Sequence, residues 1–455
     1  MADQKDILKN LKTSSLDRRF SIAKASFLAG TRWATSSASS FFASDEEKER
    51  KRKKILTEQA NYLVSEIGKL KGSIVKIGQM MALYGEHFLP REVTDALNTL
   101  NNQTIAVDWA AIEPHLLQQL GVKADDLEID QHPIGTASLA QVHKAVLKST
   151  GQQLVLKIQY PGVADAIDSD MNLFKQMLRL THLLPQTREF DQWFEEVREM
   201  MHREVDYALE AQTTLRFANY LKDDERYVVP QIIEQYCTDQ VLCMSYESGL
   251  PVNSPTVLSL SQTRRNKIGE ASLEIAIKEL FVWGEMQTDP NFGNYLVRVS
   301  ATEHEIDKIV LLDFGAIRQF DQELLTLAHN LIHAGYLHRL EDMVQAMKGY
   351  PFFDQIPADI KPDMAKVFLL ATEPFSSSSN NSDIPEGVIT QEDQYDWKKS
   401  QLHQRVMQRA SKSMASRYFS VPPKEFMFIS RKFIGAYTFM TVISAQTNIR
   451  NSLKF

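Results

Sequence analysis

Two short motifs in the second half of the chain have the residue types and spacing that phosphoryl transfer requires. Asp289 and Asn294 lie five residues apart in QTDPNFGN, where an aspartate can orient an acceptor and take its proton while an asparagine helps to hold magnesium. Asp313 follows 24 residues after Asp289, in LLDFG at the end of an apolar run. A carboxylate there can coordinate a Mg²⁺ ion that bridges the phosphates of ATP. The order predicts Asp289 as the catalytic aspartate and Asn294 and Asp313 as metal ligands.

A lysine within an apolar strand could supply the phosphate contact of the same chemistry. Lys157 lies in LVLKIQY, and an ammonium group among apolar side chains needs an anionic partner or a place at the mouth of a cleft. In kinases such a lysine binds the α- and β-phosphates of ATP and pairs with a glutamate on a following helix. The stretch REVDYALEA offers three acids, Glu204, Asp206 and Glu210. Asp206 and Glu210 share one helix face, whereas Glu204 would project roughly 160° away from Asp206 on a continuous helix.

The motifs depart from those of ordinary protein kinases. No G-x-G-x-x-G loop precedes Lys157, no HRD triplet contains Asp289, and nothing resembling A-P-E follows the DFG sequence. The residues directly before Asp289 are Met286, Gln287 and Thr288. In place of a glycine-rich loop stands PIGTASLAQVHKA (133–145). Its backbone N–H groups can still cradle phosphates, but Cβ atoms make the loop stiffer and keep it further from a ligand.

The elements expected around these motifs follow the order of a kinase-like fold. Apolar residues at steps of three and four predict an amphipathic helix over 62–84, and alternating residues predict strands between 127 and 160. Further helices are expected at 91–100, 104–128, 163–185 and 190–222, and further strands at 227–233 and 241–246. The second half is expected to be mainly helical with one buried strand, 309–314. We therefore predict an α+β fold, protein-kinase-like and two-lobed, preceded by a helical extension.

Taken in order, these motifs resemble those of the UbiB-type atypical kinase family, also called the aarF-domain or coenzyme-Q-associated kinase-like family. KIGQ (76–79) is similar to the family's KxGQ motif, and GTASLAQVH (135–143) to its Ala-rich loop, although Gly135 and Thr136 replace alanines. QTDPNFGN resembles the mitochondrial-type form of the family's aspartate loop. The resemblance implies that an N-terminal extension packs across the cleft, with the KxGQ helix where a peptide substrate would otherwise lie.

The resemblance also implies a role for each matched residue. The catalytic group would comprise Lys76, Gln79, Lys157, Glu204, Asp206, Glu210 and Asp289. The nucleotide would contact Gly135, Thr136, Ala137, Ser138, Lys157 and Met244, and the metal would be held by Asn294 and Asp313. ATP or ADP and Mg²⁺ are the implied cofactors. Lys76 and Gln79 share the polar face of their helix, and Glu204 or Asp206 would be the natural partner of Lys76.

These expectations divide the 455 residues into four parts. Residues 1–55 would form a basic mobile arm, 56–127 the helical KxGQ extension, 128–247 a kinase-like N-lobe with inserted long helices, and 248–455 a helical C-lobe. The charge supports a distinct arm, because residues 1–60 hold 13 basic and 8 acidic residues although the whole chain has a net charge of −7.

Composition limits the partners. The net charge of −7 argues against a general nucleic-acid-binding protein, and the two cysteines exclude a disulfide scaffold. The acid-free stretch 18–42 is typical of a transit segment, of a segment that seeks an anionic membrane surface, or of a mobile arm. No transmembrane helix is expected, because the longest uncharged stretch near the end, 433–449, is short and partly polar. We expect a cytoplasmic protein lying peripherally on the inner membrane, or a mitochondrial one if residues 18–42 act as a transit segment. The family resemblance adds an isoprenoid or quinone-type lipid and lipid-biosynthesis enzymes as partners.

Three functions remain open from the sequence. The first is an ATP-binding, Mg²⁺-dependent atypical kinase or ATPase that supports ubiquinone biosynthesis or homeostasis, and for it the covered cleft and the missing A-P-E argue against peptide substrates. The second is a small-molecule kinase of the aminoglycoside or choline type, against which KIGQ and REVDYALE argue. The third is a nucleotide-binding pseudokinase scaffold of a biosynthetic complex. The intact set of Lys157, Asp289, Asn294 and Asp313 argues against this third function.

Overall fold

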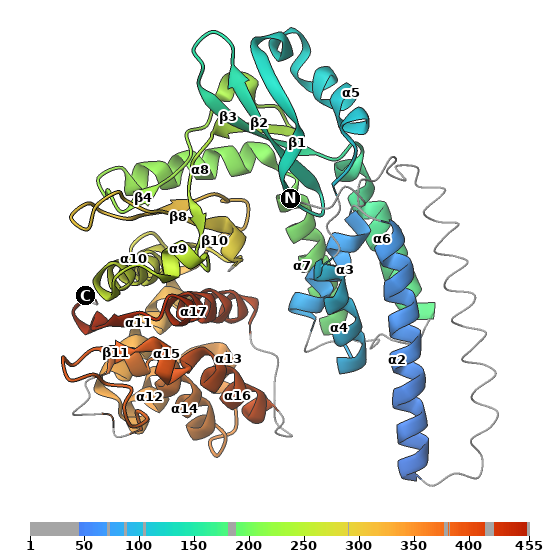
Figure 1. The fold of residues 1–455 in the computed structure, drawn as a ribbon. Coiled ribbons are helices and arrows are strands. Elements are labelled where there is room, and N and C mark those ends of the chain that lie inside the picture. The colour runs from blue at the N-terminus through green and yellow to red at the C-terminus, as the bar shows by residue number, and fades with distance from the viewer. Residues whose placement is uncertain are drawn as a thin grey trace. The chain divides into compact units, whose positions relative to one another are not determined.

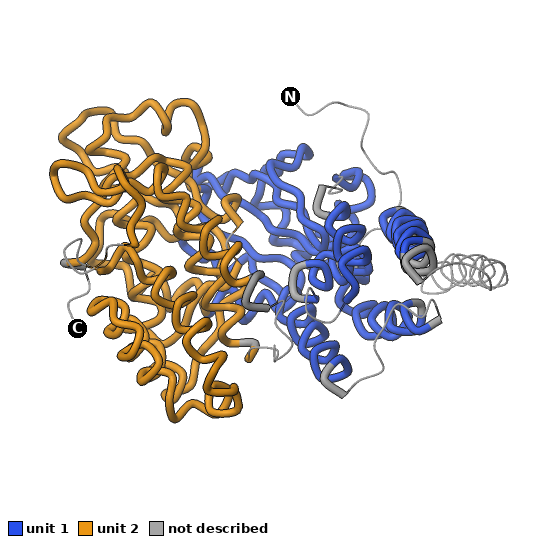
Figure 2. Tube along the Cα trace, turned by 90° about the horizontal axis from the view of Figure 1, so that it is seen from below, with its two compact units in different colours: residues 1–212, 231–246 blue, residues 213–230, 247–455 orange. Residues whose placement is uncertain are grey.

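The computed structural model describes residues 45–70, 73–85, 89–102, 106–180, 188–289, 291–376, 381, 383–414 and 423–452. The chain divides into two compact units, which Figure 2 distinguishes by colour. Unit 1 comprises residues 1–212 and 231–246, and unit 2 comprises residues 213–230 and 247–455. Helix α8 (Tyr207–Leu221) therefore contributes its first residues to unit 1 and the remainder to unit 2.

A packed group of helices opens unit 1 (Figure 1). Its members are α2 (Asp45–Leu70), α3 (Ser73–Tyr84), α4 (Arg91–Asn98), η1 (Thr99–Asn102), α6 (Val163–Leu180) and α7 (Arg188–Glu204). Helix α3 packs against α2, α4, α6 and α7, and its side chains Ile74, Ile77 and Met81 are fully buried. Of the basic arm expected over residues 1–55, residues 1–44 lie outside the described residues, and residues 45–55 form the start of α2.

The single helix expected over residues 62–84 is wrong, because α2 and α3 share this range. The sequence at the junction is Lys71-Gly72, and glycine costs about 1 kcal/mol relative to alanine in a helix interior. The helical spacing of apolar residues nevertheless continues from one helix to the next, because both bury their apolar face: Ile67 of α2 and Ile74 of α3 are at most 1% exposed.

The sheet of unit 1 is antiparallel, with the strand order β1-β2-β3-β5. The strands are β1 (Leu127–Thr136), β2 (Ala140–Leu147), β3 (Gln153–Gln159) and β5 (Val241–Ser245). Successive side chains of a strand point to opposite faces, and on β3 this places Leu154, Leu156 and Ile158 in one fully buried row. The neighbouring α5 (Trp109–Leu120), η2 (Gly121–Asp126) and η3 (Glu234–Tyr236) complete the described elements of this unit.

Unit 2 contains more strands than the sequence predicted. A four-stranded sheet has the order β4-β9-β8-β6. Two further two-stranded sheets pair β7 with β10 and β11 with β12. The strands are β4 (Tyr227–Val228), β6 (Leu250–Pro251), β7 (Glu285–Gln287), β8 (Tyr295–Arg298), β9 (Lys308–Leu311), β10 (Ile317–Gln319), β11 (Tyr395–Asp396) and β12 (Gln446–Thr447). The expectation of one strand in this half is therefore wrong. Strands of two to four residues are too short to show an alternating pattern in the sequence. They form because they pair with strands that are distant in the chain.

Helices build the rest of unit 2 (Figure 1). They are α9 (Pro255–Leu258), α10 (Gln262–Phe281), η4 (Phe292–Asn294), α11 (Gln322–Leu337), α12 (Leu340–Ala346), α13 (Pro351–Asp354), α14 (Lys361–Ala371), η5 (Glu373–Phe375), α15 (Trp397–Ser400), α16 (Leu402–Met414), α17 (Lys424–Val442) and η6 (Ile449–Ser452). Helix α10 packs against α17 and the strand β9 within one hydrophobic core. Within the described ranges, none of the helices combines the length and apolar content that a bilayer crossing needs.

Candidate functional site

In unit 1, Lys157 and Glu210 form a bidentate ion pair. The ammonium Nζ of Lys157 donates to Glu210 Oε1 at 2.7 Å and to Oε2 at 2.9 Å. The two side chains are 17% and 3% exposed. Lys157 points to the face of β3 opposite its buried leucine row, where Val155 packs with Tyr207 of α8 in a small apolar cluster. The Lys157 ammonium also lies 5.3 Å from the centre of the Tyr207 ring, within the range of a cation–π contact.

The acids between α7 and α8 do not lie on one helix. Helix α7 ends at Glu204 and α8 begins at Tyr207, so the roughly 160° separation expected from a continuous helix does not apply. Asp206 instead caps α8, because its Oδ1 accepts the main-chain N–H of Leu209 at 2.9 Å. A carboxylate at a helix N-terminus is also stabilised by the helix dipole. The side chain of Asp206 is therefore committed to the start of the helix that carries Glu210.

The KIGQ segment on α3 uses its residues in different directions. Lys76 Nζ lies 2.8 Å from Glu204 Oε1, and the two side chains are 21% and 35% exposed. Gln79 instead donates through Nε2 to the main-chain carbonyl of Leu100, at 3.0 Å. A Cβ on Gly78 would lie 2.5 Å from Leu100 Cδ1, so glycine permits the close approach of α3 to η1. The structure thus pairs Lys76 with Glu204, one of its two expected partners. The Gln79 side chain is instead bonded to the main chain of the neighbouring η1.

The Ala-rich loop is a tight connection between β1 and β2. Gly135 and Thr136 end β1. The N–H of Ala137 donates to the carbonyl of Ala140 at 2.8 Å, and this hydrogen bond closes the turn that contains Ser138. A Cβ on Gly135 would meet only Val142, at an ordinary contact distance of 3.9 Å. Packing therefore does not require glycine at position 135. The nucleotide contacts expected of these residues remain predictions.

Gln141 and His143, which the motif contains but to which we assigned no role, anchor this loop. Gln141 Oε1 accepts from the N–H of Val107 at 3.1 Å, and its Nε2 donates to the Val107 carbonyl at 3.3 Å, so the amide orientation is fixed. The same NH₂ group lies 2.8 Å from His143 Nε2, which must accept, and His143 Nδ1 must therefore donate to the Asp130 carbonyl at 2.8 Å. Burial lowers the pKa of His143, which agrees with this neutral tautomer. The signal in the sequence was a glutamine and a histidine two apart on a buried strand face.

Met244 lies on β5, where it pairs with Val155 of β3. Its side chain is 7% exposed and belongs to the cluster that contains Val155, Tyr207 and Leu242. The structure therefore places Met244 in the apolar cluster beside Lys157, and its contact with a nucleotide stays a prediction.

In unit 2, one hairpin carries the two expected metal ligands at its open end. Asn294 directly precedes β8 and Asp313 follows two residues after β9, and the N–H of Leu312 donates to the Asn294 carbonyl at 3.0 Å. Asn294 Nδ2 donates to Asp289 Oδ2 at 3.0 Å, which leaves the Asn294 Oδ1 oxygen available to a cation. Asp313 Oδ1 accepts the N–H of Gly315 at 2.8 Å. The fixed hairpin register thus brings Asp289, Asn294 and the main chain next to Asp313 together.

The donor chemistry fits Mg²⁺. Asn294 and Asp313 supply hard oxygen ligands, and Mg²⁺ is usually bound by one or two protein oxygens together with waters and substrate phosphates. Among the described residues, no group of three or more His, Cys, Asp or Glu side chains could hold a metal ion by itself. The oxygens of Asn294 and Asp313 are compatible with a magnesium site that phosphate and water oxygens complete.

Gln287 connects the two acidic motifs and was noted in the sequence only as a departure from HRD. Its Nε2 donates to the main-chain carbonyl of Asp313 at 2.7 Å, and its Oε1 accepts the N–H of Asp289 at 3.0 Å. The side chain lies on β7 and is 4% exposed. The available signal was its position two residues before the expected catalytic aspartate.

Phe314, between the acid and the glycine of the DFG sequence, is held by aromatic packing. It is 4% exposed, and its ring centre lies 5.1 Å from that of Phe217, in the part of α8 that belongs to unit 2. Phe217 also contacts Trp283, at 5.5 Å in an edge-to-face arrangement. The main chain around Asp313 is therefore held by two neighbours. Phe314 packs against α8, and the Asp313 carbonyl accepts a hydrogen bond from Gln287 of β7.

Comparison with known proteins identifies the family. Residues 99–347, more than half of the chain, match the ABC1 atypical kinase-like domain. The chain belongs to this family. The match confirms the resemblance to UbiB-type atypical kinases that the motifs indicated.

Relatives of this ABC1-family chain are similar over most of its length. Atypical kinase COQ8, mitochondrial, of Saccharomyces cerevisiae is 27% identical over 459 residues, covering 99% of this chain and 87% of the relative. Atypical kinase COQ8B, mitochondrial, of Rattus norvegicus is 28% identical over 386 residues, covering 84% and 69%. A solved complex of Rv3197 with erythromycin, from Mycobacterium tuberculosis, has a TM-score of 0.54 at 20% identity and covers 89% of this chain and 97% of that one. This last likeness shows a shared fold, and with the family match it confirms the predicted α+β, kinase-like fold class.

Proposed function

We propose that this ABC1-family protein is an ATP-binding, Mg²⁺-dependent atypical kinase or ATPase that supports ubiquinone or related isoprenoid-lipid metabolism. The observation that carries the proposal is the bidentate pairing of Lys157 with Glu210, at 2.7 and 2.9 Å, in a chain of an atypical kinase-like family. Kinases use such a pair to present the lysine to the α- and β-phosphates of ATP. Glu210 is 3% exposed, so its charge needs the lysine as a permanent counter-ion.

The residues of the chain would divide the chemistry among them. Lys157 would bind the α- and β-phosphates, and Asn294 and Asp313 would hold the metal. Mg²⁺, when bound, neutralises negative charge on the phosphate oxygens. Asp289 would orient the attacking hydroxyl or water and accept its proton. Its hydrogen bonds with Asn294 and with the Gln287 side chain, both at 3.0 Å, support a fixed position for that task.

The remaining predicted residues would bind or restrain the nucleotide. The Ala-rich loop, with Gly135, Thr136, Ala137 and Ser138, would lie along the phosphates, and Met244 would contact the base. Lys76, held by Glu204 at 2.8 Å, would place a positive charge on the KIGQ helix near the nucleotide. The family resemblance implies a helical extension that packs across the cleft, which would leave no ordinary place for a peptide, so the acceptor would be a small molecule, a lipid or water.

The names of the relatives support the setting of the reaction. Both curated relatives described above are named COQ8-type and mitochondrial. We therefore propose a mitochondrial or other inner-membrane setting, with peripheral attachment through the basic stretch 18–42 to an anionic surface. Quinone precursors and lipid-biosynthesis enzymes would be the partners.

The deciding experiment measures ATP hydrolysis by the purified full chain with and without Mg²⁺, anionic liposomes and phenolic quinone precursors. We expect Mg²⁺-dependent turnover that rises when liposomes and precursors are both present. Turnover that responds to aminoglycosides or choline would support the small-molecule kinase instead. Nucleotide binding without turnover under any of these conditions would support the pseudokinase scaffold.

A further inference from the structure

Beneath the aspartate loop of unit 2 lies a fully buried ion pair that the proposed chemistry does not use. Lys432 of α17 and Glu279 of α10 approach to 2.6 Å between Nζ and Oε2, and their side chains are 5% and 3% exposed. The two helices lie side by side (Figure 1). Removing two charges from water is costly, and an apolar pair of similar volume often stabilises a fold equally well. The pair therefore suggests a task other than stability.

Each member of the pair contacts one flank of the segment from Asp289 to Asn294. Lys432 Nζ lies 3.3 Å from the hydroxyl of Tyr295, the residue directly after Asn294. Glu279 lies on α10, which packs against β7, the strand that contains Gln287 two residues before Asp289. The ion pair thus bonds the residue that directly follows the aspartate loop and belongs to a helix that packs against the strand before the loop.

Gln287 of β7 connects the aspartate loop with the second acidic motif. The Gln287 side chain bonds the N–H of Asp289 at 3.0 Å and the carbonyl of Asp313 at 2.7 Å. If the Gln287 main chain shifts, both of these contacts shift with it. Contacts therefore run from Lys432 to Glu279 on α10, from α10 to the neighbouring β7, and from Gln287 of β7 to the two acidic motifs.

Lys432 is buried and has little free space around it. A cavity of about 20 Å³ lies beside it, lined by Ser272, Phe292, Tyr295, Lys432, Gly435, Ala436 and Phe439. Such a volume accommodates a single water molecule. A methionine of similar length fits the same space, which makes Lys432→Met a suitable probe.

We propose that Lys432, acting through Glu279 and Tyr295, is a positioning residue that sets the aspartate loop and thereby the affinity for Mg²⁺-ATP. The effect on Mg²⁺-ATP affinity rests on the proposed nucleotide function. The effect on the order of the aspartate loop is independent of that function. A pair that served only to stabilise the fold would have no specific effect on this loop.

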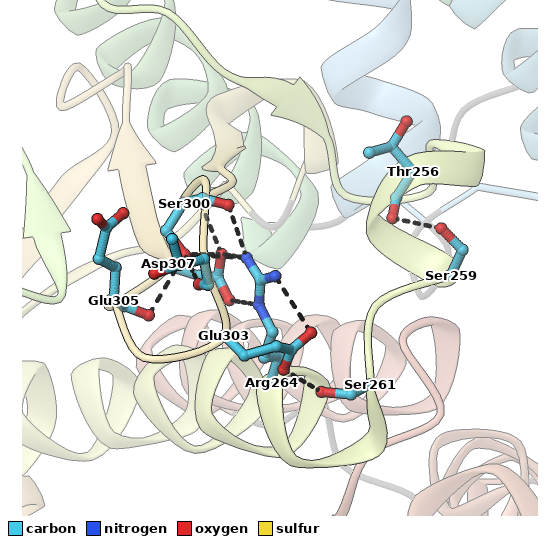
Figure 3. Close-up of polar contacts among 9 residues, drawn as sticks. Thr256, Ser259, Ser261, Arg264, Ser300, Glu303, Glu305 and Asp307 are labelled. Carbon is cyan, nitrogen blue, oxygen red and sulfur yellow. Dashed lines mark hydrogen bonds and ion pairs between the residues drawn. The ribbon is translucent and has the colours of Figure 1, made fainter.

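Unit 2 contains a matched control on the same helix. Arg264, also on α10, pairs with Asp307 through a bidentate contact, and the two side chains are 9% and 4% exposed (Figure 3). Asp307 also accepts the N–H of Ser300 at 2.9 Å, so this pair ties down the loop at the end of the β8–β9 hairpin away from Asn294. Its removal should loosen the hairpin loop and spare the aspartate loop.

The test compares three double variants of the full chain. Lys432→Met with Glu279→Leu removes both charges and the polar group on α10, whereas Lys432→Met with Glu279→Gln removes the charges but keeps a polar side chain beside β7. Arg264→Met with Asp307→Leu is the control. Hydrogen exchange without nucleotide is measured for peptides covering residues 286–295 and 299–307, since exchange reports local opening. Mg²⁺-ATP affinity is measured by thermal-shift titration.

We expect the Leu variant to exchange at least about tenfold faster over 286–295 and to bind Mg²⁺-ATP at least about fivefold more weakly, with the Gln variant between it and the wild type. The control should exchange faster only over 299–307 and keep its affinity within twofold. If the Leu variant does not fold, Tyr295→Phe should still give a smaller acceleration over 286–295. Unchanged exchange over 286–295 in the folded Lys432 variants, or an equal acceleration there in the control, would overturn the proposal. A wild type that does not bind Mg²⁺-ATP contradicts the proposed function alone, because the exchange data still decide the positioning role.

Discussion

Lys157 donates hydrogen bonds to both carboxylate oxygens of Glu210, and this contact joins the third strand of the sheet to the first turns of α8. The carboxylate is 3% exposed and the lysine 17%, so neither charge is well solvated. Each residue therefore depends on the other for its charged state, and a change at either one affects both stability and the phosphate contact.

Replacing Lys157 by methionine should weaken Mg²⁺-ATP binding at least tenfold, which corresponds to about 1.4 kcal/mol. The variant should also lose about 3–5 kcal/mol of stability, because Glu210 is left buried without its counter-ion. Thermal melts with and without Mg²⁺-ATP measure both effects. Lys144→Met on the neighbouring strand is the control, because the Lys144 ammonium lies over the Tyr246 ring, 4.1 Å from its centre, and should not affect affinity more than twofold. Equal affinity losses in the two variants would remove Lys157 from the site.

Asp313→Asn should preserve the local turn and weaken magnesium-dependent binding. An asparagine Oδ1 can still accept the N–H of Gly315, which Asp313 accepts at 2.8 Å, but the charged oxygen ligand is lost. We expect Mg²⁺-ATP affinity to fall tenfold or more while magnesium-free nucleotide binding changes little. Isothermal titration with and without Mg²⁺ measures the difference. Asp321→Asn, at the N-cap of α11, is the control, and the prediction is wrong if wild type and Asp313→Asn show the same dependence on Mg²⁺.

Lys76→Ala should change nucleotide affinity or ATP turnover at least about fivefold with the fold intact, because one hydrogen bond to a charged group can contribute about 1.5–3 kcal/mol. Lys76 pairs with Glu204 at 2.8 Å and is 21% exposed. The matched control is Arg91→Ala, since Arg91 pairs with Asp95 at 3.7 Å in the same helical group but is 91% exposed. Changes at such surface pairs usually stay within about 0.5 kcal/mol. If both variants behave alike in binding and hydrolysis, the KIGQ helix has no contact with the nucleotide.

His143 should make the protein less stable as the solution becomes acidic. Burial lowers the pKa of His143 below its ordinary value of 6.5, against a smaller opposing effect of Asp130. Below pH 6.5 the histidine of the unfolded chain takes up a proton, whereas His143 of the folded chain does so only at lower pH. The free energy of unfolding therefore falls as pH falls, by up to about 1.4 kcal/mol per pH unit. His143→Gln should therefore show a shallower decline than the wild type between pH 7 and pH 5 in denaturant titrations. The exposed His132→Gln is the control, and a slope in His143→Gln equal to that of the wild type would contradict the prediction.

Deleting residues 1–44 should reduce binding to anionic liposomes. The deleted segment contains the acid-free basic stretch 18–42, and attraction of basic residues to an anionic surface weakens with salt. We expect co-sedimentation of the full chain to decrease with rising salt, and that of the truncated chain to be low throughout. The same liposomes without anionic lipid are the control. Co-sedimentation that the deletion leaves unchanged would show that other residues contact the membrane.

Much of unit 1 could be predicted because its signals are local and repeated. The strand around Lys157 has a long apolar run, so residue types alone predicted that the lysine needs an anionic partner. The choice of Glu210 among the three acids of REVDYALEA came from the family resemblance. The break between Glu204 and Tyr207 did not follow. Asp206 is compatible with a continuous helix in the sequence, and it becomes a cap only because the chain turns there.

The direction of Gln79 shows a second limit. A polar residue on the polar face of a helix was expected to point into a polar site, but the Leu100 carbonyl lies within reach and takes its hydrogen bond. A helical pattern gives the face of a residue and does not identify which distant main-chain group needs a donor. Gln287 and Lys432 are of the same kind, since their partners are distant in the chain or belong to the main chain.

Gln287 gives the link between the two acidic motifs a property that a titratable side chain would not have. Its amide donates to the Asp313 carbonyl and accepts from the Asp289 N–H, and it carries no charge in either role. A histidine in its place would gain a proton in mild acid and would then have no acceptor left for Asp289. This link between the two motifs therefore contains no titratable side chain of its own, and mild acid leaves the donor and acceptor roles of Gln287 unchanged.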